Sequence, residues 1–202
     1  MNLLSSFHIL SYLYWALLLL VTTGALVCAV LAFKLQKQVY AIASAGALAA
    51  GLLLATITAP QGPNAFGIVL GMLGLALAVI GGGPMAVLAL KLATMNSVQP
   101  GTHGGIMVDN EGKTTQDDTV TTSAVHEVLR GGLTIGILER LAVAGAILAG
   151  FPEAIAVVIA IKGVGRFTEL AAAESRERFI IGTFASLIWA CACAALVRLA
   201  VS

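Results

Sequence analysis

Two adjacent charged residues, Glu139 and Arg140, lie inside the otherwise apolar run GGLTIGILERLAVAGAILAG. If this run is helical, residues 141–150 place about 15 Å of helix between the pair and Phe151. That length is half of the ~30 Å hydrocarbon core of a bilayer, so we expect the pair to lie near the membrane midplane. A charged residue at that depth costs about 2.5–3.5 kcal/mol on insertion scales, which makes the pair the first candidate for a functional site.

The sequence that follows supplies a partner for this pair. Gly150 and Pro152 flank Phe151 as a helix stop and a helix start, which predicts a tight antiparallel hairpin. Arg140 precedes Phe151 by eleven residues and Lys162 follows it by eleven. The two cations therefore reach a similar depth on neighbouring helices.

Acidic and basic residues around the hairpin together predict an anion site. We expect Glu139 to pair with Lys162 across the hairpin and Arg166 to lie one helical turn beyond Lys162 on the same face. Because the cations outnumber the acids, we predict a net-positive pocket open to the cytoplasm, suited to a phosphate, a carboxylate or a lipid head group. The alternative is that these charges form interhelical ion pairs that fix the packing of three helices, with the outermost arginines acting as topology signals. The predicted ligand-binding residues are Glu139, Arg140, Lys162, Arg166, Arg178 and Arg130.

A second unusual feature is the sequence GGGP at 81–84, in the middle of an apolar run. One interpretation is a broken helix that exposes carbonyl groups to a cation. The other is a kink at which a neighbouring helix crosses closely. We favour the kink, because the first three apolar runs contain no acidic residue that would attract a cation.

The sequence lacks the signatures of several other functions. It has no HExxH sequence, nucleophile elbow, P-loop or alcohol-phosphotransferase motif, so we predict no catalytic residue and no cofactor. Polar residues at 96–127 show no metal-ligand spacing, and Cys28, Cys191 and Cys193 are expected to be packing residues. A net charge of +1 argues against a nucleic-acid partner.

Composition predicts the fold class. Hydrophobic residues make up 59% of the 202 positions and charged residues 10%, where a soluble domain has about 25% charged residues. We therefore expect an all-α polytopic membrane protein with about six spans, the first of them retained and not a cleaved signal peptide. A three-span half at 1–95 and a second at 128–202 would flank a flexible polar linker at 96–127. The apolar segments are 9–33, 40–59, 67–95, 131–150, 152–163 and 179–201.

The distribution of Lys and Arg predicts the orientation. They gather in the connectors at 34–37, 91–130 and 162–178, whereas the connectors at 60–66 and 150–152 contain none. By the positive-inside rule the first set is cytoplasmic, and both termini are external. Arg198 is the exception, because it would lie near the external end of the last span.

Three sequence elements of the second half resemble a pattern found in uncharacterised bacterial membrane proteins. They are RGGLTIGILER, KGVGRF and ERFIIGT, which fit G-x-x-I-G-x-L-E-R, K-x-x-x-R-F/Y and F-x-I-G-T between Arg130 and Ser186. The Ala- and Gly-rich remainder looks like actinobacterial membrane proteins. The resemblance implies a location in the bacterial cytoplasmic membrane and supports the choice of site. It implies no substrate, because the family has no assigned function.

These observations leave two classes of function. The first is a small carrier or binder of an anionic solute or lipid, with membrane lipids as its surroundings. The second is a non-catalytic membrane subunit or scaffold whose charged face docks another membrane protein or a second copy of the chain. A lipid-modifying enzyme is a more distant alternative.

Overall fold

The computed structural model describes residues 3–57, 64–93, 132–165 and 173–202, all of them in or next to helices. The linker at 96–127 lies outside these ranges, as do Arg130 and Arg166. Within the described ranges the chain is all-helical and contains no strand, as the composition predicts. The helices are α1 (Leu3–Leu35), α2 (Gln38–Ala55), α3 (Asn64–Ala93), α4 (Gly132–Leu148), α5 (Ala154–Gly165) and α6 (Ala173–Val201).

Four of these helices, α1, α2, α3 and α6, are long and apolar enough to cross a membrane. Their outward side chains are largely aliphatic, and Leu20, Leu53 and Met72 are each about 70% exposed. A soluble domain does not leave so many large apolar side chains in water. The exposed surface is that of a protein embedded in lipid.

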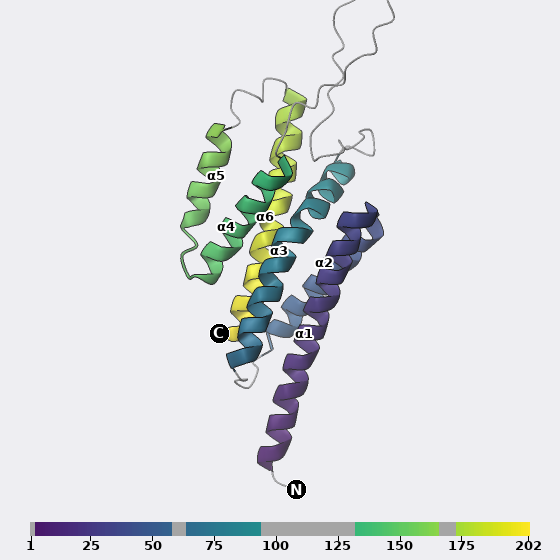
Figure 1. Cartoon of the computed structure of the whole chain (residues 1–202), viewed down its shortest axis with the longest axis vertical. Helices are drawn as coiled ribbons and strands as arrows, with labels where there is room; N and C mark the ends of the chain where they lie inside the picture. The colour runs from purple at the N-terminus through teal and green to yellow at the C-terminus, as the bar shows by residue number, and fades with distance from the viewer. Residues whose placement is uncertain (1–2, 58–63, 94–131, 166–172) are drawn as a thin grey trace, which may run out of the picture.

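The α4–α5 hairpin is shorter than the other helices. Its described helices have 17 and 12 residues, about 25 and 18 Å, against ~30 Å for a hydrocarbon core. The hairpin starts and ends at the same end of the bundle (Figure 1). The direction of α6 is therefore the same whether the hairpin crosses the bilayer fully or turns within it.

The hairpin turn forms as the sequence predicts. Gly150 adopts a left-handed conformation with a φ of 79°, which only glycine enters without strain. The Phe151 N–H donates to the Ala146 carbonyl and the Gly150 N–H donates to the Ile147 carbonyl. These two bonds make a Schellman motif that ends α4. Pro152 follows, and α5 begins two residues later at Ala154.

The core of the bundle is the α3–α6 pair, which forms the most extensive helix interface. Figure 1 shows α1 and α2 on one side of this pair and the α4–α5 hairpin on the other. Glycines on α3 allow the close approach: a Cβ at Gly81 would lie 2.5 Å from Trp189 Nε1, and one at Gly74 would lie 2.5 Å from a Val197 methyl group. The Trp189 indole N–H donates to the Leu77 carbonyl at 3.0 Å.

The GGGP sequence lies within this interface. α3 continues as one helix through Pro84, so the broken-helix interpretation is not seen. Gly81 and Gly82 are instead the positions at which side chains from α6 and α4 pack against the α3 backbone. The close crossing of neighbouring helices is therefore seen, and the kink stays a prediction.

Two hydrogen bonds join α1 to α2, and an aromatic stack joins α1 to α3. The buried Ser44 hydroxyl donates to the Ala25 carbonyl at 2.8 Å, and the Tyr14 hydroxyl donates to the Leu54 carbonyl at 3.2 Å. Trp15 stacks on Phe66 with ring centroids 6.1 Å apart, which joins α1 to the start of α3. These contacts lie away from the charged residues of the second half.

Candidate functional site

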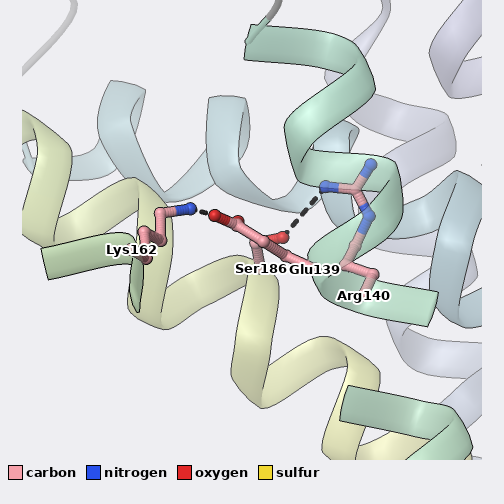
Figure 2. A network of polar contacts seen from close by, with 4 residues as sticks. All are labelled: Glu139, Arg140, Lys162 and Ser186. Atoms are coloured by element: carbon pink, nitrogen blue, oxygen red, sulfur yellow. Dashed lines mark hydrogen bonds and ion pairs between the residues drawn. The ribbon is translucent and has the colours of Figure 1, made fainter. Parts of the chain in front are cut away.

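The predicted pairing of Glu139 with Lys162 is confirmed. The Lys162 ammonium donates to Glu139 Oε2 across the hairpin, as Figure 2 shows. The side chains are 16% and 12% exposed, respectively, so the ion pair is largely withdrawn from the surroundings. The turn geometry explains the match, because Glu139 is twelve residues before Phe151 and Lys162 eleven after it, and such residues on two antiparallel helices lie at nearly the same level.

Arg140 leaves α4 in a different direction from Glu139 (Figure 2). Its side chain is only 5% exposed and inserts between α3 and α6. The guanidinium donates from Nε to the Val79 carbonyl at 2.8 Å and from Nη1 to the Ser186 hydroxyl at 3.1 Å. Arg140 thus joins α4 to both helices of the core.

Glycines make the space that this large side chain occupies. A Cβ at Gly82 would lie 2.9 Å from Arg140 Nε and 3.0 Å from Ser186 Oγ, and it would lie closer still to Arg140 Cδ. A Cβ at Gly136, one turn earlier on α4, would lie 3.0 Å from Arg140 Nη1. The guanidinium therefore lies in a slot bounded by the helix backbone at Gly82 and Gly136 and by the Ser186 hydroxyl.

Arg140 meets its partners halfway along the two core helices, and the midplane depth of the charged residues stays a prediction. Val79 and Ser186, the partners of Arg140, lie at the centres of α3 and α6, each near the middle of about 30 residues. Glu139 neighbours Arg140 at this level, whereas the Lys162 side chain that pairs with it lies beside Phe179, nearer to the start of α6. In the membrane orientation that the four long helices require, this level is the hydrocarbon core.

The expectation that Arg140 and Lys162 share one pocket needs correction. Successive residues on a helix point about 100° apart, so the residue next to Glu139 cannot also face α5. Arg140 faces the α3–α6 core, where its hydrogen bonds fit the packing alternative as well as a site. Whether any of the six predicted residues binds a ligand stays a prediction.

Lys162 borders a groove between α5 and α6. The groove has a volume of about 150 Å³, and the Lys162 side chain lies in its wall with Nζ 5.5 Å from the centroid of the Phe179 ring. A cation at this distance from an aromatic face is attracted to the ring. Neither Glu139 nor Arg140 is among the residues that line the groove.

The remaining predicted residues divide between the described and the undescribed parts of the chain. Arg178 lies on the first turns of α6, one residue before Phe179, with a partly buried side chain. Arg130 and Arg166 are outside the described residues, so their place relative to the groove stays a prediction. No group of three His, Cys, Asp or Glu side chains in the described ranges could hold a metal ion.

Sequence reasoning missed three contributors to this region. From the sequence, Ser186 enters only as the end of the stretch that carries the resemblance, Gly82 only as part of GGGP, and Phe179 only as part of ERFIIGT. The glycines could have been used as evidence, since a buried arginine side chain needs neighbouring helix positions that lack side chains. That Gly82 and Ser186 meet Arg140 depends on which helices are neighbours, which the sequence does not state.

Comparison with known proteins adds no further constraint. No protein-family model matches the chain, and neither a curated protein nor a solved structure matches it. The resemblance of the ILER, KGVGRF and ERFIIGT elements to bacterial membrane proteins therefore stays a prediction.

Proposed function

We propose that this protein binds an anionic ligand within the membrane, with Lys162 as the residue that meets the anion. The observation that carries the proposal is a lysine held at the wall of a groove, at the level of the bilayer core. Lysine at that depth is costly and is usually found where a ligand, an ion or a partner compensates the charge.

The charge balance of the described cluster supports an anion. Glu139 carries one negative charge, and Arg140 and Lys162 carry one positive charge each, so the three sum to +1. The described hydrogen bonds of Arg140 go to neutral acceptors, the Val79 carbonyl and the Ser186 hydroxyl. An anion near Lys162 would neutralise the cluster.

The hydrogen bonding of Lys162 allows it to bind an anion while it stays paired with Glu139. An ammonium group has three N–H donors, and the Glu139 carboxylate accepts from it through one oxygen. A second anionic oxygen can therefore approach from the groove side while the ion pair persists. Arg176 and Arg178 follow on α6 toward the end of the bundle that bears Lys34, Lys37 and Lys91.

That end of the bundle is the one we propose to be cytoplasmic. Figure 1 shows that the end of α1, the end of α3 and the start of α6 lie together, which gathers their Lys and Arg residues. The positive-inside rule then gives external termini, in the bacterial cytoplasmic membrane that the sequence resemblance implies. Arg198 is a cation at the opposite, external end of the bundle, and its position has a local explanation. Its Nη1 lies 3.9 Å from where a Gly150 Cβ would be, beside the carbonyl end of α4, which attracts a positive charge.

The docking-subunit alternative also has an observation in its favour. Among the described helices α5 packs closely only on α4, and Val157, Ile161 and Val164 are exposed on it. Lipid covers such a face as well as a partner does, however, and a partner would not explain the unbalanced charge. We therefore place the anion binder first.

Binding to the purified protein tests the proposal. Thermal-shift and native mass spectrometry measurements would use phosphatidylglycerol, inorganic phosphate and glycerol phosphate as probes. The Glu139→Gln, Lys162→Met double variant removes the cation without leaving a buried carboxylate unpaired, and Lys91→Met is a control at the same end of the bundle. Binding to wild type and to Lys91→Met but not to the double variant is expected. If no anion binds, or if the double variant binds as wild type does, the proposal is wrong.

A further inference from the structure

The groove beside Lys162 is mainly apolar. Lys162 and Thr183 are its polar members, and the others include Ile159, Phe179, Phe184 and Leu187. A soluble anion such as phosphate would gain nothing from these aliphatic and aromatic walls. The composition of the groove suits a ligand with a hydrocarbon part as well as a charge.

The length of the groove corresponds to one leaflet. Along α6 its lining residues recur at spacings of three and four from Phe179 to Leu187, which makes a continuous stripe on one face. Eight residues of helix span about 12 Å, and half of a hydrocarbon core is ~15 Å. An acyl chain from the adjacent leaflet could therefore lie in the groove along most of the depth of that leaflet.

The groove also opens toward lipid. Within the described residues α5 has no close backbone approach to α6; it packs on α4, and its Lys162 ammonium lies over the Phe179 ring of α6. A Cβ at Gly163, in the α5 wall, would meet nothing within 4 Å. A ligand can therefore enter sideways from the bilayer.

The polar groups of the groove are ordered as a lipid requires. Lys162 lies beside Phe179, at the end of the stripe nearer to the start of α6, and Leu187 lies at the deep end. Thr183 is one turn deeper than Phe179, where a hydroxyl can donate to the ester carbonyl that follows a lipid phosphate.

We infer that this groove is a binding site for an anionic lipid, with one acyl chain along α6 and the head-group phosphate at Lys162. The inference rests on the proposed function and names its ligand. Because the acyl chain leaves one hydrocarbon environment for another, the groove offers it close packing and not a hydrophobic gain. Preference among lipids must then come from the charge of the head group.

Filling the groove tests this inference without removing a charge. Gly163→Leu places a side chain in open space within the groove, and Gly46→Leu makes the same change at another exposed glycine with nothing within 4 Å, on α2. Each purified variant would be titrated with phosphatidylglycerol, with phosphatidylcholine of the same acyl chains, and with glycerol phosphate. Native mass spectrometry would report bound ligand.

We expect wild type and Gly46→Leu to prefer phosphatidylglycerol over phosphatidylcholine, and Gly163→Leu to lose at least tenfold in affinity for it. Glycerol phosphate, which has the charge but no chain, should bind wild type at least tenfold more weakly than the lipid. If glycerol phosphate binds as tightly as the lipid and Gly163→Leu has no effect, the lipid inference fails while the anion proposal stands. Equal binding of the two lipids also overturns the inference, and absence of all binding overturns both.

Discussion

The slot that holds Arg140 makes Gly82→Ala the most informative single substitution in this protein. The added methyl group would overlap Arg140 Cδ and lie 2.9 Å from its Nε. It would also lie 3.0 Å from the Ser186 hydroxyl, on the other side of the slot. Since the wall at this point is helix backbone, the guanidinium has to move, and it cannot move into water at this depth.

The expected loss of stability can be assembled from two terms. Overpacking a filled interior costs typically about 1–3 kcal/mol. Displacing the guanidinium also weakens its bonds to the Val79 carbonyl and the Ser186 hydroxyl. Interhelical hydrogen bonds in membranes contribute roughly 0.6–2 kcal/mol each. Together these terms predict that Gly82→Ala lowers the free energy of unfolding by about 2 kcal/mol, and by about 7 kcal/mol at most if both bonds are lost.

Gly145→Ala, on α4, is the matched control. It is a helical glycine with nothing within 4 Å of the added Cβ, so it should raise stability by about 0.5–1 kcal/mol through helix propensity alone. Reversible unfolding in mixed micelles, followed by circular dichroism, would measure both. A second arm combines Gly82→Ala with Arg140→Ala, which removes the side chain that clashes.

In that double variant the penalty of Gly82→Ala should largely disappear, so the two changes should be strongly non-additive. The slot interpretation is refuted if Gly82→Ala and Gly145→Ala have similar effects. It is also refuted if Gly82→Ala destabilises equally in the presence and absence of the Arg140 side chain.

Three further predictions concern the hairpin and the topology. Glu139→Gln and Lys162→Met should each lower the yield of folded protein, because each strands a buried charge, and the double change should recover much of it; a purely additive cycle would show that the two residues do not interact. Gly150→Ala should destabilise by about 1–2 kcal/mol in the same unfolding assay, since alanine is strained at a φ of 79°, and an unchanged stability would contradict the turn geometry. In a cysteine-free background, a cysteine at Glu153 should react with an impermeant reagent outside intact cells and one at Asp117 should not; strong external labelling at Asp117 would reverse the proposed orientation.

The fold and the main ion pair could be predicted because both depend on local sequence and on counting. Apolar length identifies the helices, Gly150 and Pro152 identify the turn, and equal distance from Phe151 places Lys162 beside the Glu139–Arg140 pair. Each step uses only positions along one hairpin. No knowledge of the other helices is needed.

The environment of Arg140 could be predicted only in part. Helical periodicity separates the directions of Glu139 and Arg140 by about 100°, so their divergence was available from the sequence and was overlooked. Its partners were not available, because Val79 and Ser186 lie 61 and 46 residues away, on helices whose packing order the sequence does not give. The groove was likewise beyond prediction, since it arises where α5 fails to pack on α6.

The two adjacent charged residues, Glu139 and Arg140, hold different parts of the α4–α5 hairpin in place. Arg140 attaches α4 to the α3–α6 core, whereas Glu139 attaches α5 to α4 through Lys162. Because α5 has no other close helix neighbour within the described residues, Glu139–Lys162 is its one ion pair to the rest of the described bundle. An anion that competed with Glu139 for Lys162 would loosen α5 and leave α4 in place. If Lys162 binds the proposed anion, the same residue would therefore also determine how firmly α5 is held to α4.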